Sequence, residues 1–287
     1  MIQLGDFRLH LINDSRTLVD AGGAFGLVPR LLWSGVFMPP TEDNLVPMMQ
    51  HNLLVQAHGR NLLIDTSYGD KMTGKQNANF HRESFNGGTL SALARLGLTP
   101  NDIDLVIDTH LHGDHCGGNT TYAADGSLIP VFPNAEYVVQ RREYEDASRP
   151  NERTRATYSA ANFQPLVETG QMRLLDGDTE LLPGIRGMVT PGHTPGHMSV
   201  TLESGGQHAA FICDLASYAV HFERLGWMTA YDVEPLVTLE TKRRWQAWAL
   251  ETNALLIFPH DPLRPMGHLI ENADGKRLVV KVDEEYV

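Results

Sequence analysis

The chain has 287 residues, 42% of them hydrophobic, and a formal net charge of −12 at pH 7. This length fits one large domain or two small ones, and the negative charge disfavours nucleic-acid binding, which needs a basic surface against phosphates. Apolar runs stay well below about 18 residues and no secretory signal is visible, so we expect no membrane span. Cys116 and Cys213 make no disulfide framework, which favours the cytoplasm.

Short apolar segments bounded by turn residues predict strands along the whole chain. In chain order these are residues 7–12, 53–57, 61–65, 104–109, 136–139, 172–175, 185–189, 199–202, 209–213 and 254–260. Apolar residues at helical spacing predict helices. These are residues 89–96, 141–147, 154–163 and 236–252. The glycine-rich segment 20–26 lacks the lysine of a P-loop and does not match G-x-G-x-x-G, so we reject a nucleotide site there.

The densest group of chemically useful side chains directly follows the predicted strand 104–109. His110, His112, Asp114 and His115 lie within six residues and are followed by two glycines that leave room for a turn. On an extended strand His110 and His112 would point to the same side. A lone histidine is usually structural, but four such groups without a ligand would be desolvated or repel one another for no gain. Imidazoles and a carboxylate at this density favour a transition metal.

Three later strands end at residues of the same types. The strand 185–189 runs into a Pro/Gly-rich loop that presents His193 and His197, and such a rigid loop suits a metal ligand. Asp214 follows an apolar strand, where an unpaired buried carboxylate would be costly and a metal contact would compensate it. His260 ends the last apolar strand. We therefore expect His193, Asp214 and His260 to join the early histidine cluster.

The motif H-x-H-x-D-H with these distant residues resembles the metallo-β-lactamase fold superfamily along nearly the whole chain. The resemblance implies an α+β fold, an αββα sandwich of two mixed β-sheets flanked by helices, as one domain over residues 1–287. It also implies two divalent metal ions, with Asp214 bridging them. Zinc suits the ligands, and iron, cobalt and manganese are compatible with them. The implied ligands are His110, His112 and His193 for one ion, and Asp114, His115 and His260 for the other.

Within the superfamily the sequence is most similar to quorum-quenching N-acyl homoserine lactonases and to methyl parathion hydrolase-like enzymes. The segments that carry the similarity are residues 20–29, 109–115, 131–135, 214–215 and 230–232. The resemblance implies that a hydroxide held between two metals opens a lactone ring, with Asp114 shuttling the proton. It gives Asp65 and His197 the role of orienting ligands by hydrogen bonds; a plain turn residue is the alternative for Asp65. Gly113 departs from the pattern, because lactonases often carry a larger residue there.

Two other functions stay open on the same scaffold. One is a phosphotriesterase or arylesterase of the methyl parathion hydrolase type, and the other is a non-catalytic sensor. Residues 141–163 are a candidate substrate lid by analogy with metallo-hydrolases. The expected partner is a small-molecule lactone or ester, and a homodimer is compatible with the sequence. Aromatic residues are candidate walls of the substrate pocket, with ordinary core packing as the alternative for each. They are Phe25, Trp33, Phe37, Tyr218, Phe222 and Trp227.

Overall fold

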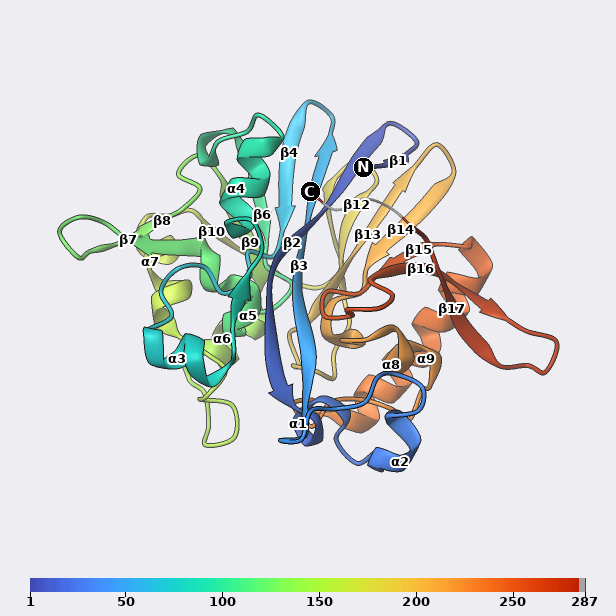
Figure 1. Ribbon diagram of the computed structural model, residues 1–287. Coiled ribbons are helices and arrows are strands. Elements are labelled where there is room, and N and C mark those ends of the chain that lie inside the picture. Colours follow the sequence, from blue (N-terminus) through green and yellow to red (C-terminus); the bar gives the residue numbers. More distant parts are fainter. Residues whose placement is uncertain (284–286) are drawn as a thin grey trace.

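Two β-sheets pack face to face in the middle of the molecule, and helices cover their outer faces (Figure 1). The computed structural model describes residues 1–283 and 287. Both sheets contain parallel and antiparallel neighbours. The predicted αββα sandwich of two mixed sheets is therefore confirmed.

The first sheet has the strand order β1-β2-β3-β4-β6-β9-β10, and β5 pairs with β2. Its strands are β1 (Ile2–Leu4), β2 (Phe7–Asp20), β3 (Leu45–Ala57), β4 (Arg60–Ile64), β5 (Glu83–Ser84), β6 (Leu105–Ile107), β9 (Glu136–Gln140) and β10 (Met172–Leu175). Strands β4, β6, β9 and β10 run parallel to one another, whereas β1 to β4 are antiparallel. A separate hairpin is formed by β7 (Thr120–Tyr122) and β8 (Leu128–Pro130).

The second sheet follows chain order from β11 to β17. Its strands are β11 (Thr179–Leu182), β12 (Ile185–Val189), β13 (Met198–Ser204), β14 (Gln207–Phe211), β15 (Leu255–Ile257), β16 (Met266–Glu271) and β17 (Arg277–Lys281). Only the β14–β15 pair is parallel among these described strands. That parallel step requires a long crossover, and helix α9 lies within it.

The helices are short except for one. They are α1 (Ala21–Phe25), α2 (Arg30–Trp33), α3 (Gly74–Asn79), α4 (Gly88–Arg95), α5 (Gly113–Cys116), α6 (Arg141–Ser148), α7 (Gln164–Glu168), α8 (Ala219–Glu223) and α9 (Pro235–Thr252). The predicted helices near 89–96, 141–147 and 236–252 correspond to α4, α6 and α9. Over the described residues, none of these helices combines the length and apolarity that a membrane crossing needs.

The continuous apolar runs in β6 and β15 explain the layered packing. In β6, Leu105 and Ile107 face the core between the sheets, while Val106 packs on the outer side with Leu93 of α4. In β15, Leu255 and Ile257 enter the same central core, while Leu256 packs on the outer side with Ala249 of α9. Strands that are covered on both faces need apolar residues at every position, because successive side chains alternate between the faces.

The predicted helix over residues 154–163 is wrong. This segment forms turns and a single 3₁₀ turn at Ala160–Asn162. Its backbone is used elsewhere: the Gly113 amide donates to the Thr157 carbonyl at 3.0 Å, and Tyr158 forms a β-bridge with His112. Tertiary hydrogen bonds to the histidine segment thus replace the helical ones that the apolar spacing predicts.

Candidate metal centre

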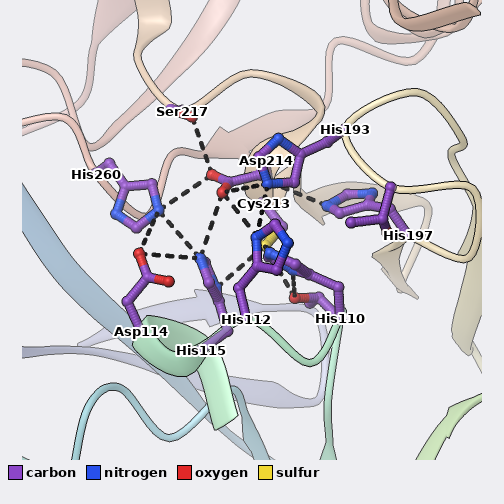
Figure 2. Close-up of polar contacts among 12 residues, drawn as sticks. His110, His112, Asp114, His115, His193, His197, Cys213, Asp214, Ser217 and His260 are labelled. Carbon is purple, nitrogen blue, oxygen red and sulfur yellow. Dashed lines mark hydrogen bonds and ion pairs between the residues drawn. The ribbon is translucent and has the colours of Figure 1, made fainter. Parts of the chain in front are cut away.

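The strands bring the predicted ligands to one place. Parallel strands end at the same edge of a sheet, so the residues that follow β4 and β6, and those that follow β14 and β15, come together there. Figure 2 shows the imidazoles and carboxylates of the predicted ligands pointing toward one another from these strand ends and from the loop after β12. These residues are His110, His112, Asp114, His115, His193, Asp214 and His260.

The seven residues divide into two clusters with Asp214 between them. Ligand atoms of His110, His112 and His193, the first cluster, lie within 4.8 Å of one another. Those of Asp114, His115 and His260, the second cluster, satisfy the same limit. Oδ2 of Asp214 lies 3.2 Å from Nε2 of His193, and its Oδ1 lies 3.1 Å from Nε2 of His260. One carboxylate therefore reaches both clusters, as the sequence predicts for a bridging ligand.

The hydrogen bonds of the imidazoles show that the donor set fits cations. Nδ1 of His115 lies 2.8 Å from Oδ2 of Asp65, and Nδ1 of His260 lies 2.6 Å from the Met49 carbonyl oxygen. Since both partners are acceptors, we assign a proton to Nδ1 of each ring, so Nε2 is the nitrogen directed at the site. These two Nε2 atoms are 3.1 Å apart. Two ring nitrogens this close need a positive charge between them, either a bound cation or a proton on one of the rings.

The first cluster shows the same requirement. Nε2 of His193 lies 3.1 Å from Nδ1 of His112. Nε2 of His110 is buried and has no hydrogen-bond partner among the described residues. A buried polar atom without a partner is costly, and coordination of a metal ion would satisfy it.

Burial and neighbouring charges set the protonation states of the ligands. Desolvation, reinforced by the surrounding imidazoles, holds the pKa of His110 and of His112 well below its usual value, so both rings are neutral. Burial opposes ionisation of Asp214, but His260, His193 and His115 outweigh it and keep the pKa of that carboxyl well below its usual range. Burial opposes protonation of His115 and His193, but acidic neighbours outweigh it and raise the pKa of both rings, so a divalent ion would displace protons from them when it binds.

Asp65 and His197 lie behind the ligands, where the sequence places them. Asp65 has a left-handed backbone (φ 58°), and its carboxylate accepts from the Thr109 amide at 2.9 Å as well as from His115. His197 accepts at Nε2 from the Asp214 amide at 3.1 Å, and its Nδ1 contacts Thr190. Asp65 thus holds the ring of His115 in the second cluster, and His197 holds the backbone of Asp214 between the clusters.

Two contacts of the centre come from residues to which the sequence assigns no role. Asp232 accepts at Oδ1 from Nδ1 of His193 at 2.9 Å, and it lies in an irregular loop between α8 and α9. Ser217 donates from Oγ to Oδ1 of Asp214 at 3.0 Å. Asp232 belongs to the segment 230–232 of the similarity noted above, but the sequence gives it no role at the metal centre. Ring orientation by a carboxylate follows no periodicity that could reveal it.

Cys213 also lies near the ligands but does not resemble one. Its Sγ groups with ligand atoms of His110 and His115 within 4.8 Å. Burial raises the pKa of the Cys213 thiol, so it stays protonated, and the thiolate is the form that binds metals. Sγ lies 2.9 Å from Oγ1 of Thr109. Cys213 is therefore a packed neighbour of the ligands.

A cavity of about 520 Å³ opens above the two clusters. His112, Asp114, His193 and Asp214 contribute to its lining. Much of the remaining wall is apolar or phenolic. This part of the wall includes Val19, Met48, Tyr68, Phe80, Tyr158 and Tyr231. Such a wall suits a neutral substrate with an apolar portion.

The aromatic residues predicted to contact substrate lie elsewhere. Phe25 stacks on Trp33 at 4.4 Å between ring centroids, within a core cluster that also holds Phe37 and Tyr218. The Tyr218 hydroxyl donates to the Pro47 carbonyl at 3.2 Å, and Phe222 packs against Phe258. Trp227 packs partly buried against the same core cluster.

None of these predicted aromatic residues belongs to the described lining of the cavity, so the prediction that they contact substrate is not supported. Their types alone do not distinguish a pocket wall from a core. Three phenols take their place in the lining, Tyr68, Tyr158 and Tyr231.

Residues 45–272 match the family model described as "Metallo-beta-lactamase superfamily". The chain belongs to this superfamily. It is 27% identical to an N-acyl homoserine lactonase of Bacillus cereus over 233 residues, which are 77% of this chain and 84% of that protein. It is 30% identical to N-acyl homoserine lactonase AiiA of Bacillus thuringiensis subsp. kurstaki over 173 residues, 60% of this chain and 61% of that protein. The match thus spans about three fifths of the length of several curated lactonases.

Solved structures of the superfamily have the same fold. A probable metal-dependent hydrolase from Staphylococcus aureus is 31% identical, covers 100% of both chains and gives a TM-score of 0.88. The dizinc quorum-quenching lactonase AidC, in complex with a hexanoyl-homoserine product, is 20% identical, with a TM-score of 0.77 over 99% of this chain and 97% of that one. The predicted superfamily and fold are confirmed, and these relatives support the predicted metallo-hydrolase class.

Proposed function

We propose that this member of the superfamily is a dinuclear metal-dependent hydrolase that opens lactone rings, with N-acyl homoserine lactones as its main substrates. One observation carries the proposal: two ligand clusters share the Asp214 carboxylate at the base of a cavity with apolar and phenolic walls. The apolar wall would accommodate an acyl chain. Ions held by the two clusters would bind the carbonyl oxygen of the ester and the oxygen that leaves. The lactonase relatives, which match 60–77% of the chain, support the same substrate class.

The donor set is best matched by two divalent ions, with zinc as the first choice. When bound, such ions would lower the pKa of a coordinated water to about 7 and polarise a carbonyl oxygen. The protein residues keep the ligands in place: Asp65 and Asp232 hold the rings of His115 and His193, and His197 holds the backbone of Asp214. These contacts orient the donors before any ion binds.

Asp114 is the residue we propose for proton transfer. Its side chain is 15% exposed and lines the cavity, whereas Asp214 is 5% exposed. Oδ2 of Asp114 lies 3.7 Å from Nε2 of His115 and 3.8 Å from Nε2 of His260. From this position the carboxylate would accept the proton of the attacking water and return it to the ring oxygen that leaves.

The second candidate is hydrolysis of a phosphotriester or aryl ester at the same ligands. It is favoured by the position of Tyr218, a candidate substrate contact of a lactonase, which is buried and bonds to the Pro47 carbonyl and does not line the cavity. We further propose that the protein is a single domain. We also propose that it acts in the cytoplasm, since both of its cysteines are free and buried. A homodimer stays a prediction.

A substrate panel on one zinc-loaded preparation tests the proposal. Zinc content is measured first, and then turnover of N-hexanoyl homoserine lactone, a dialkyl aryl phosphotriester, an aryl acetate and a β-lactam. We expect two zinc ions per chain and the highest kcat/KM for the lactone, with activity lost in the His112→Ala variant. Faster turnover of the phosphotriester would favour the second candidate. Two bound ions with no turnover of any ester would favour a sensor.

A further inference from the structure

A buried carboxylate outside the ligand set joins three separate parts of the candidate site. Glu143 lies in the first turn of α6 and is 0% exposed. Its Oε1 accepts from the Leu111 amide at 3.0 Å and from the Tyr158 hydroxyl at 3.0 Å, and its Oε2 accepts from Oγ1 of Thr194 at 2.5 Å. No lysine, arginine or histidine in the described residues forms an ion pair with it. Three neutral donors therefore satisfy this buried acid.

Two of the three donors belong to the loops that supply the first cluster. Leu111 lies between His110 and His112, and Thr194 directly follows His193. The carboxylate thus links two loops that are about 80 residues apart in sequence, as the separation of 81 between His112 and His193 shows. The loop after β12 also approaches α6 closely, because a Cβ on Gly196 would lie 2.2 Å from the Glu143 amide nitrogen. Small movements of either loop would change the spacing of the first-cluster ligands.

The third donor lies in the wall of the cavity. The Tyr158 ring is 5.0 Å from the His112 ring between centroids, and its backbone bridges to His112. Tyr158 belongs to the irregular segment that the sequence predicts as a helix, so its place depends on such tertiary contacts. The bond to Glu143 fixes the phenol where it forms part of the lining.

We propose that Glu143 is a positioning residue that holds the first-cluster loops at ligand spacing and anchors Tyr158 as a wall of the cavity. The proposal rests on the proposed function, since it assumes that the first cluster binds a metal ion. It makes Glu143 act through Leu111, Thr194 and Tyr158, and not by contact with ion or substrate. Loss of the carboxylate should therefore weaken one of the two metal sites selectively.

Two substitutions of similar size separate hydrogen bonding from charge. In Glu143→Gln the amide oxygen can accept from Leu111 and Tyr158, and the amide nitrogen can donate to the Thr194 hydroxyl. In Glu143→Leu all three donors lose their acceptor. Zinc affinity is measured for each of the two ions by competition with a chromophoric chelator. His112→Ala and His260→Ala serve as references for loss of the first and the second cluster.

We expect Glu143→Leu to lower zinc affinity by about 10- to 100-fold at the site that His112→Ala affects. Zinc affinity at the site that His260→Ala affects should stay unchanged. Glu143→Gln should restore affinity to nearly the wild-type value. Tyr158→Phe should keep both zinc affinities and raise KM with kcat unchanged. Should Glu143→Leu fail to fold, Thr194→Val carries the affinity test, because it removes one donor and keeps the side-chain volume.

Three results would overturn the proposal. Unchanged affinity for both ions in Glu143→Leu, or in Thr194→Val where the first does not fold, would remove its basis. An equal loss at both clusters, together with lower thermal stability of the metal-free protein, would show a merely structural role. Failure of the wild-type protein to bind zinc at all would reject the proposed function itself, and this inference with it.

Discussion

Nδ1 of His193 and Oδ1 of Asp232 lie 2.9 Å apart, although 39 positions separate the two residues in the chain. The same carboxylate oxygen accepts from Oγ1 of Thr229 at 2.9 Å, so Asp232 is itself held in place. Since the carboxylate is an acceptor, it fixes the ring proton on Nδ1 of His193. Nε2 is then the nitrogen directed at the first cluster, 3.2 Å from Oδ2 of Asp214.

Replacement of Asp232 should therefore weaken metal binding without removing a ligand. We expect Asp232→Ala to lower zinc affinity or kcat/KM by about 10- to 100-fold, and Asp232→Asn to lower it less, because the amide oxygen can still accept. Chelator competition and steady-state kinetics measure the two effects. Asp176→Asn is the matched control, since Asp176 is exposed and pairs only with Arg141 among the described residues. Wild-type affinity in Asp232→Ala would contradict this role.

Removal of metal should destabilise the fold, because the buried ligands then lose the cations that satisfy them. Nε2 of His115 and Nε2 of His260 are 3.1 Å apart, and Asp214 is buried between the clusters. An ion present at about 100 times its dissociation constant adds about 2.7 kcal/mol to the free energy of unfolding. We expect a chelator to lower Tm in a thermal scan and added zinc to restore it. The prediction fails if Tm is the same with and without chelator.

The sequence predicts those parts of the site where histidine or aspartate residues directly follow an apolar strand. His110, His112, Asp114 and His115 are adjacent in sequence, so their density is visible without any fold. Asp214 and His260 are found because each ends an apolar strand, and β14 and β15 lie side by side in parallel. Residue types at strand ends thus predict that these side chains meet, whereas their role as metal ligands rests on the resemblance to the superfamily.

The parts that the sequence does not predict depend on contacts between distant segments. Tyr158 lies in a segment with helical apolar spacing, but its neighbours bond to the backbone beside His112. Phe25 and Tyr218 are aromatic residues of the kind that lines pockets, but both are packed in a hydrophobic core. Glu143 and Asp232 act through hydrogen bonds to distant segments, which leave no periodicity in the sequence. Each of these features is decided by tertiary packing, which overrides local preference.

Gly113 should control the width of the cavity. It contributes to the lining, and a Cβ at this position would meet only the Thr157 carbonyl oxygen at 3.8 Å and the Asn162 amide nitrogen at 4.0 Å, which are ordinary contacts. We therefore expect Gly113→Ala to fold and bind metal like the wild type. Gly113→Phe should fill part of the cavity and raise KM for long-chain homoserine lactones more than for short-chain ones. Kinetics over a series of acyl lengths measure this effect, and an equal change for all lengths would contradict it.

Lys242 should make stability depend on pH in the alkaline range. Its ammonium group is buried and donates to the carbonyl oxygens of His221 at 3.0 Å and Trp227 at 2.5 Å. Burial lowers the pKa of Lys242 from 10.5 to about 8. Between these values the unfolded chain holds the proton more tightly than the folded one, so the free energy of unfolding rises with pH. Below about pH 8 both states are protonated, and the full cost of the buried charge, about 3 kcal/mol, is present.

Comparison with Lys242→Met isolates this effect from other titrating groups. We expect the free energy of unfolding of the wild type, relative to that of Lys242→Met, to increase by up to about 3 kcal/mol as the pH rises from about 8 to 10.5. Urea unfolding of both proteins in chelator measures the difference without interference from metal. Lys281→Met is the matched control, because that side chain is 45% exposed and its removal should give a flat difference. A flat difference for Lys242→Met as well would mean that the buried amine keeps its ordinary pKa.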